Sequence, residues 1–249
     1  MNFTSFEFYL FLPLVFALYW MMKGKTRPQN VLLLLASYLF YGWWDWRFLI
    51  LILISSIADY TLGLTMENQD DEKKKKALLY LSIGVNLGIL GFFKYFNFFI
   101  SSLIAAFELM GIHLSIHTLN IVLPVGISFY TFQTLSYTID IYRGRIKATR
   151  DWVSFFTFVA FFPQLVAGPI ERAAKMIPQF QKERIFEYRD MVEGFRFILY
   201  GMFKKIVIAD YCGAQANEIF DNYQAYGGSD LFLGIYFFIL YEHEQTEKR

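Results

Sequence analysis

The sequence predicts an all-α protein, a polytopic bundle of transmembrane helices with additional re-entrant and interfacial helices. Composition is the first observation: of 249 residues, 56% are hydrophobic and only 18% are charged, against roughly 25% in an average soluble domain. The length of the apolar stretches is the second observation. A helix needs about 20 residues to cross a bilayer core of roughly 30 Å, and several stretches come close to that length. The lipid bilayer is therefore the first partner that we expect.

Five stretches are the firmest candidates for spanning helices, and each contains at most one charged residue. They cover residues 3–22, 29–44, 48–66, 77–93 and 118–139. The first is expected to be a retained span, because no basic region precedes it and no small-residue cleavage site follows it. A sixth stretch, 191–211, is apolar but interrupted by charges. We expect one membrane-embedded domain over residues 1–241 and a disordered hydrophilic tail over 242–249.

Lysine and arginine residues predict the orientation of these helices, since short cytoplasmic loops carry an excess of them. Sixteen lie in the segments 23–27, 73–76, 143–150 and 172–189, whereas Arg47 and Lys94 lie in the intervening loops. The four basic segments share the cytoplasmic side only if residues 95–107 do not cross the membrane. That segment would form a helix of about 20 Å, too short for a crossing, so we expect it to be interfacial or re-entrant.

The uncharged segment 152–170 has basic neighbours on both sides, so it is expected to return to the side it left. Pro163 removes a helical hydrogen bond, and Pro169 disfavours helix at Gly168. Broken helix at membrane depth occurs where protein or a water-filled cavity satisfies the backbone, so the re-entrant motif Pro163, Gln164, Gly168 and Pro169 is expected to line a cavity. An ordinary proline-kinked helix in a bundle is the alternative. Next, residues 177–190 predict an amphipathic helix on the cytoplasmic interface.

Four polar residues share one stripe of the helix expected over 191–211. They are Glu193, Arg196, Tyr200 and Lys204, which fall within an arc of about 80° on a helical wheel of 100° per residue. We expect this stripe to face the protein interior or an aqueous cavity, with Glu193 and Arg196 close enough to pair. A structural ion pair with snorkelling lysines explains the same pattern equally well.

A second polar seam follows the helix expected over 118–139. Gln133, Ser136 and Tyr137 are spaced i, i+3 and i+4, and the seam continues to Asp140 at the cytoplasmic interface. Such a seam either holds helices together through hydrogen bonds or lines a tunnel. The candidates for lining a substrate cavity are Gln133, Tyr137, Asp140, Arg196 and Lys204.

No metal site, bound cofactor or nucleic-acid partner is expected. His113 and His117 have the i, i+4 spacing of a helical metal pair, but no carboxylate lies between them and no third ligand lies nearby. His243 falls in the hydrophilic tail. The single cysteine, Cys212, excludes an internal disulfide and a thiolate metal site. A net charge of +1 without a clustered basic face gives no footprint for nucleic acid.

Four motifs resemble the bacterial branch of the membrane-bound O-acyltransferases, and in particular its alginate O-acetylase-type members. They are LPVGISFYTFQ at 123–133, YTIDIYRG at 137–144, FFPQLVAGPI at 161–170 and GMFKKIVIAD at 201–210. The aromatic run YLFYGWW at 38–44 fits as well. The similarity covers nearly all of the chain up to about residue 238.

The resemblance implies a multi-pass enzyme of the bacterial inner membrane with a cavity through its centre. A cytoplasmic acyl donor, acetyl-CoA or another acyl thioester, would supply an acetyl group for an extracellular polysaccharide such as alginate, directly or through a second extracytoplasmic acetyltransferase. In the family, a histidine in an Arg-Trp-His type segment activates the acceptor or takes the acyl group. This sequence contains no such segment, so no catalytic residue is assigned to it.

The final apolar run, 231–241, has 11 residues, or about 16 Å of helix, roughly half a membrane. We therefore expect a truncated or frameshifted gene or a fragment that is inactive by itself, with a genuine short paralogue as the alternative. A different functional class also stays open: a non-catalytic membrane partner or transporter-like subunit of exopolysaccharide export or modification, which would use the same cavity without the histidine.

Overall fold

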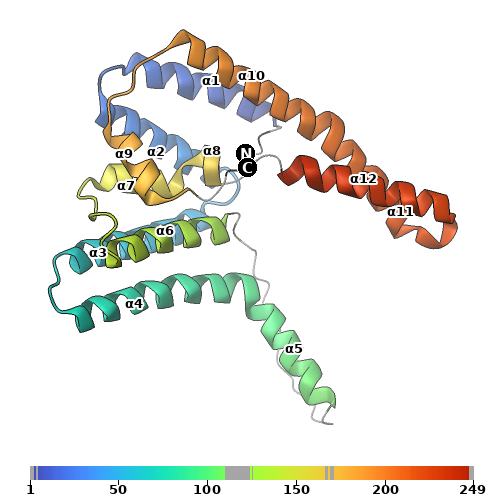
Figure 1. Cartoon of the computed structure of the whole chain (residues 1–249), viewed down its shortest axis with the longest axis horizontal. Coiled ribbons are helices and arrows are strands. Elements are labelled where there is room, and N and C mark those ends of the chain that lie inside the picture. Colours follow the sequence, from blue (N-terminus) through green and yellow to red (C-terminus); the bar gives the residue numbers. More distant parts are fainter. Residues whose placement is uncertain are drawn as a thin grey trace. The chain divides into compact units, whose positions relative to one another are not determined.

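The computed structural model describes residues 3, 5–109, 124, 126–165, 168 and 171–246, with side chains up to residue 242. It divides into two units: Met1–Val166 with Ile170–Arg184, called unit 1, and Ala167–Pro169 with Ile185–Arg249, called unit 2. All regular secondary structure in the described residues is helical, as the sequence predicts (Figure 1).

Unit 1 begins with four helices that closely follow the predicted apolar stretches. They are α1 (Phe6–Met21), α2 (Thr26–Gly42), α3 (Arg47–Glu67) and α4 (Glu72–Leu90). Asp71 caps α4 by accepting a hydrogen bond from the Lys73 N–H at 2.9 Å. By length and composition, two helical stretches of the described chain are long and apolar enough to cross a membrane, Arg47–Glu67 and Glu72–Leu109.

The second of these stretches corrects a predicted boundary. We expected a separate short segment at 95–107, but the helix continues from α4 through a π-turn, Gly91–Tyr95, into α5 (Phe96–Leu109). A wider turn bends a helix without ending it, and Figure 1 shows α5 leaving the direction of α4. No residue of α5 is buried, and its interfacial position stays a prediction.

Helix α6 (Ile127–Tyr142) is the central element of unit 1, because it packs against α3, α4, α7 and α9. Gly126 precedes it with φ of 78°, a conformation that favours glycine. A Cβ at Gly126 would also lie 3.2 Å from the carbonyl oxygen of Leu165. The start of α6 therefore lies directly against Leu165.

The broken helix consists of α7 (Trp152–Ala160) and α8 (Phe162–Leu165), interrupted at Phe161, whose ψ is 104°. The break comes two residues before Pro163, as the sequence predicts. Helix α9 (Ala173–Gln181) then packs against α7, and the Gln181 amide donates to the Thr149 hydroxyl at 3.0 Å. The end of α9 therefore lies beside the residues that precede α7, whereas the return of 152–170 to one side of the membrane stays a prediction and Pro169 lies outside the described residues.

The amphipathic helix predicted over 177–190 is wrong. Helix α9 ends at Gln181, residues 182–187 are not helical, and α10 begins at Tyr188. Tertiary contacts explain the difference. The buried side-chain amide of Asn30 donates to the Phe180 backbone carbonyl at 2.7 Å, and Arg184 donates to the side-chain oxygen of Asn30 at 2.7 Å. These contacts replace the hydrogen bonds that would continue the helix.

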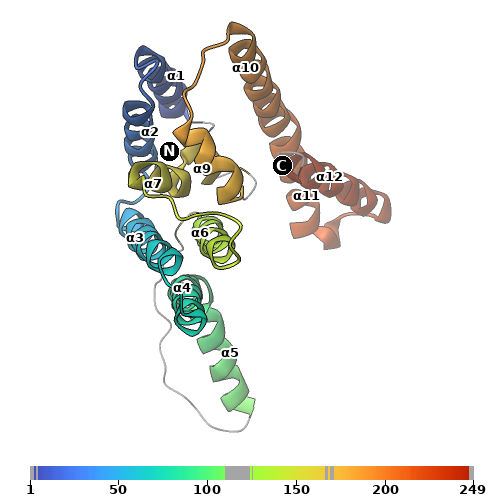
Figure 2. The same ribbon diagram turned by 60° about the vertical axis from the view of Figure 1, so that its left-hand side comes forward.

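Three basic connections of unit 1 lie at one end. Tyr60 near the end of α3 donates to the Arg150 carbonyl at 2.8 Å, and Asn30 near the start of α2 donates to Ser154 near the start of α7 at 3.2 Å. Figures 1 and 2 show the α1–α2, α3–α4 and α6–α7 connections at this end. Lys94 lies elsewhere, within 3.3 Å of Ser128 near the start of α6.

Unit 2 contains α10 (Tyr188–Phe203), a π-helical stretch Lys204–Ala209, α11 (Asp210–Asp221), a short 3-10 turn Tyr223–Ala225 and α12 (Gly228–Thr246). Helices α11 and α12 form a close hairpin: a Cβ at Gly213 would lie 2.8 Å from the Tyr241 ring. The tail was expected to be disordered, but α12 is helical to Thr246, so the apolar run 231–241 is part of a helix of 19 residues.

Candidate functional site

The most deeply buried charged group of unit 1 is the carboxyl of Asp59 on α3, which is 0% exposed. Its Oδ1 accepts a hydrogen bond from the Ser82 hydroxyl at 2.6 Å, and its Oδ2 accepts one from the Asn86 amide at 2.7 Å. Both partners lie on α4, four residues apart, and therefore on one face of that helix. Asp59 thus joins α3 to α4 through neutral donors.

The same cluster extends to α6. The side-chain oxygen of Asn86 accepts from the Ser55 hydroxyl at 2.9 Å and from the Thr134 hydroxyl at 3.1 Å. The Ser82 hydroxyl lies 3.1 Å from the Thr138 hydroxyl. In the described part of the chain, no cation forms an ion pair with Asp59. The Asp59 carboxyl therefore accepts from two neutral groups of α4, and these groups connect it to Ser55 of α3 and to Thr134 and Thr138 of α6.

Sequence reasoning did not select this cluster, although two signals were present. Asp59 is the only charged residue in the stretch 48–66, and a carboxyl inside an apolar helix suggests function or a buried partner. Ser82 and Asn86 share one face of the next helix. The third contribution, from Thr134 and Thr138, depends on how α6 packs and could not be read from spacing.

Of the predicted cavity residues, Gln133 is buried between α6 and α7. Its amide donates to the Phe158 carbonyl at 2.6 Å, and Phe158 lies in the last turn of α7, where backbone carbonyls lack helical partners. The contact satisfies a carbonyl that the broken helix leaves free. For Gln133, the described contacts match the helix-packing interpretation of the polar seam.

Tyr137 and Asp140 lie further along α6, toward the basic end. The Tyr137 hydroxyl accepts from the Thr149 N–H at 3.1 Å, and its ring lies 4.7 Å from that of Phe155, centroid to centroid. Asp140 forms an ion pair with Arg145 at 3.4 Å. Both side chains therefore hold the α6–α7 connection against α6.

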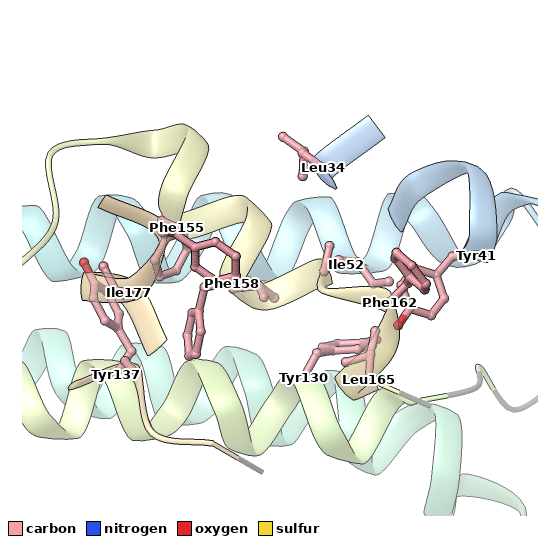
Figure 3. Packing of buried hydrophobic residues seen from close by; sticks show 14 of the residues in the cluster. Leu34, Tyr41, Ile52, Tyr130, Tyr137, Phe155, Phe158, Phe162, Leu165 and Ile177 are labelled. Atoms are coloured by element: carbon pink, nitrogen blue, oxygen red, sulfur yellow. The ribbon is translucent and has the colours of Figure 1, made fainter. Parts of the chain in front are cut away.

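Of the re-entrant motif, Pro163 and Gln164 lie within α8, Gly168 follows it, and Pro169 lies outside the described residues. Pro163 is exposed in the first turn of α8, Gln164 is buried, and Gly168 lies in a bend. Two tyrosine hydroxyls in this part of the core, those of Tyr41 and Tyr130, have no hydrogen-bond partner within the described structure. Figure 3 shows both side chains at the α8 end of the core cluster with Leu165. Buried polar atoms without a partner are rare in native structures, so these two hydroxyls single out this part of the core.

The remaining two candidates, Arg196 and Lys204, belong to unit 2, whereas Gln133, Tyr137 and Asp140 belong to unit 1. Arg196 is exposed, and the partner of Glu193 is Arg189 at 3.1 Å instead of the expected Arg196. The Lys204 ammonium lies over the Tyr200 ring, 5.0 Å from its centroid. Their role as cavity residues stays a prediction.

Residues that could ligate a metal do not gather in the described structure, where no group of three or more His, Cys, Asp or Glu side chains occurs. The pair His113 and His117 and the His243 side chain lie outside the described residues. Cys212 is buried in α11.

Comparison with known proteins identifies relatives over most of the chain. It is 41% identical over 213 residues to the "Probable alginate O-acetylase AlgI" of Pseudomonas putida, covering 85% of this chain and 43% of that protein. It is 39% identical over 213 residues to the protein of the same name from Pseudomonas aeruginosa, covering 85% and 40%. It is 32% identical over 247 residues to the peptidoglycan O-acetyltransferase of Helicobacter pylori, covering 88% and 46%. No family model and no solved structure matches.

The chain spans less than half the length of these relatives, so their complete activities describe those proteins. Within the matched region, however, the similarity includes most of unit 1, with its buried polar cluster and broken helix. Over that region, the chain is similar to proteins named alginate O-acetylase and peptidoglycan O-acetyltransferase, which matches the alginate O-acetylase branch of the membrane-bound O-acyltransferases that its motifs resemble.

Proposed function

We propose that this chain is part of a multi-pass O-acetyltransferase of the bacterial inner membrane. The enzyme would move an acetyl group from a cytoplasmic thioester, acetyl-CoA, toward an extracellular polysaccharide such as alginate, directly or through a second extracytoplasmic acetyltransferase. The observation that carries the proposal is 41% identity over 85% of the chain to a protein named for alginate O-acetylation.

Unit 1 supports the membrane part of this proposal. Its basic α1–α2, α3–α4 and α6–α7 connections lie at one end, whereas Lys94 lies in the π-helical turn after α4 and Arg47 is the first residue of α3. This distribution matches the positive-inside rule. The helix broken at Phe161 enters from the basic end and returns to it. Such a segment is tolerated at membrane depth when protein or a cavity satisfies its backbone, and Gln133 does so here.

Acetyl transfer to a hydroxyl requires a base that takes the acceptor proton and a path that brings the thioester carbonyl to that oxygen. We assign no base to this chain, because the histidine segment of the family is not part of its sequence. Its residues form the scaffold: the Asp59 cluster joins α3, α4 and α6, and the unpartnered hydroxyls of Tyr41 and Tyr130 beside α8 are available to a carbonyl or hydroxyl on the acyl path.

The test is a hybrid enzyme. The 213 matched residues of this chain replace their counterparts in the Pseudomonas putida relative, and the hybrid is expressed in a strain that lacks the native gene. We expect acetyl esters on the secreted polysaccharide, measured by NMR, with none from the unfused chain. A hybrid that accumulates in the membrane as well as the intact relative but yields no esters would overturn the proposal and would favour a non-catalytic or transporter-like subunit.

A further inference from the structure

Arg184 is held in a fixed position at the basic end of unit 1. One terminal nitrogen of its guanidinium donates to the side-chain oxygen of Asn30 at 2.7 Å, and the other lies 3.4 Å from the side-chain oxygen of Gln29. The rings of Tyr19 and Phe180 flank the guanidinium, with centroids 5.8 and 5.7 Å from its carbon. Residues of α1, α2 and α9 therefore contribute to the site.

The two amides that accept these hydrogen bonds are themselves oriented by other contacts. Asn30 is 1% exposed, and its amide nitrogen donates to the Phe180 carbonyl at 2.7 Å and to the Ser154 hydroxyl at 3.2 Å. The amide nitrogen of Gln29, also 1% exposed, donates to the Tyr19 carbonyl at 3.1 Å. Both amides consequently present their oxygens to Arg184, so the geometry exists before any ligand arrives.

The partners of Arg184 are neutral. Among the described residues no carboxylate forms an ion pair with it. The Asp151 carboxylate caps α7, accepting from the Val153 N–H at 3.1 Å and from the Ser154 hydroxyl at 2.5 Å. Glu183 points toward the α1–α2 turn, where its Oε1 would lie 3.7 Å from a Cβ on Gly24.

A half-buried cation without a counter-ion is costly, because burial removes water that no opposite charge replaces. Burial lowers the pKa of the Arg184 guanidinium, yet an arginine keeps its charge at neutral pH. Two of its five N–H groups are occupied, and the others remain for an oxyanion. The exposed cations around the α1–α2 connection add positive potential: Lys23, Lys25 and Arg27.

We propose that Arg184, oriented by Gln29 and Asn30, binds a phosphate group at the basic end of unit 1. A guanidinium matches the geometry of phosphate oxygens and donates two parallel hydrogen bonds to them. This group belongs either to the headgroup of an anionic phospholipid or to a soluble phosphate ligand such as the nucleotide part of coenzyme A. The proposal does not rest on acetyl transfer, and its test measures binding alone.

The experiment uses the purified full chain in two arms. In the lipid arm, nanodiscs contain phosphatidylcholine alone or with phosphatidylglycerol, and native mass spectrometry counts the phospholipids retained on release. In the soluble arm, inorganic phosphate or coenzyme A is titrated in neutral detergent and the melting temperature is followed. The variants are Arg184→Gln, which removes the charge and keeps an amide, and Lys182→Gln, a matched control two residues away in the same extended segment.

We expect the unaltered chain and Lys182→Gln to bind in at least one arm, and Arg184→Gln to bind about tenfold more weakly or worse, as expected for a lost charge-assisted contact. The responding arm identifies the phosphate source. Should Arg184→Gln fail to accumulate, Arg184→Lys keeps the charge without the planar fork and is expected to bind several-fold more weakly. Absence of binding in both arms, or equal losses in the position-184 and position-182 variants, overturns the proposal.

Discussion

Replacing Asp59 by alanine tests the role of the buried cluster most sharply. The substitution removes the acceptor of two buried donors, the Ser82 hydroxyl and the Asn86 amide, and leaves a void. A buried donor without a partner costs about 1–3 kcal/mol. Asn86 retains the Ser82 carbonyl at 3.0 Å, which limits the loss. We therefore expect Asp59→Ala to lower the free energy of unfolding by about 2–5 kcal/mol.

Asp59→Asn is the matched comparison, because asparagine keeps the shape of the side chain and one carbonyl oxygen. Its amide can donate to the Ser82 hydroxyl, so a loss below about 1.5 kcal/mol is expected. The assay is thermal unfolding in detergent, followed by circular dichroism, where each kcal/mol shifts the midpoint by about 2–4 °C. Asp70→Ala, on the exposed α3–α4 turn, is the control. If Asp59→Ala has the same unfolding midpoint as the unaltered chain and this control, the cluster does not hold the helices together.

Three further predictions use the same melting assay. Gly63→Ala is expected to lower the free energy of unfolding by about 1–3 kcal/mol, because its Cβ would lie 2.9 Å from the Tyr137 ring. Gly84→Ala, which has no neighbour within 4 Å, should be neutral or stabilising. Equal melting temperatures of the two variants would refute close α3–α6 packing. Tyr137→Phe leaves the buried Thr149 N–H without its acceptor and should cost about 1–3 kcal/mol; an unchanged midpoint argues against that contact. Gln133→Ala leaves an α7 carbonyl unsatisfied and should cost a similar amount, whereas a residue that only lines a tunnel would leave the midpoint unchanged.

Helix positions in unit 1 could be predicted because they depend on local quantities. The apolar stretch 48–66 becomes the helix Arg47–Glu67, and Pro163 predicts the interruption that occurs at Phe161. Apolar length and proline chemistry act within a few residues of the chain. The gathering of basic connections at one end follows from the same alternation of apolar and basic segments.

What the sequence does not reveal depends on partners distant in the chain. Residues 177–190 have amphipathic composition, yet Asn30, about 150 residues earlier, ends the helix at Gln181. Asp59 is visible as an isolated charge, but its two donors come from α4, and one of them, Asn86, is held in turn by Thr134 of α6. Arg196 shares a helical stripe with Lys204, and the wheel alone cannot establish whether that stripe meets α6.

Sidedness of the basic connections is the measurement that tests the membrane orientation most directly. Cys212 is the only cysteine, so Cys212→Ser gives a background without thiols, to which Lys74→Cys, Arg145→Cys and Arg47→Cys are added one at a time. Intact cells are treated with a membrane-impermeant maleimide. We predict labelling at position 47 in intact cells and at positions 74 and 145 only after permeabilisation. Labelling of positions 74 and 145 from opposite sides would contradict the arrangement.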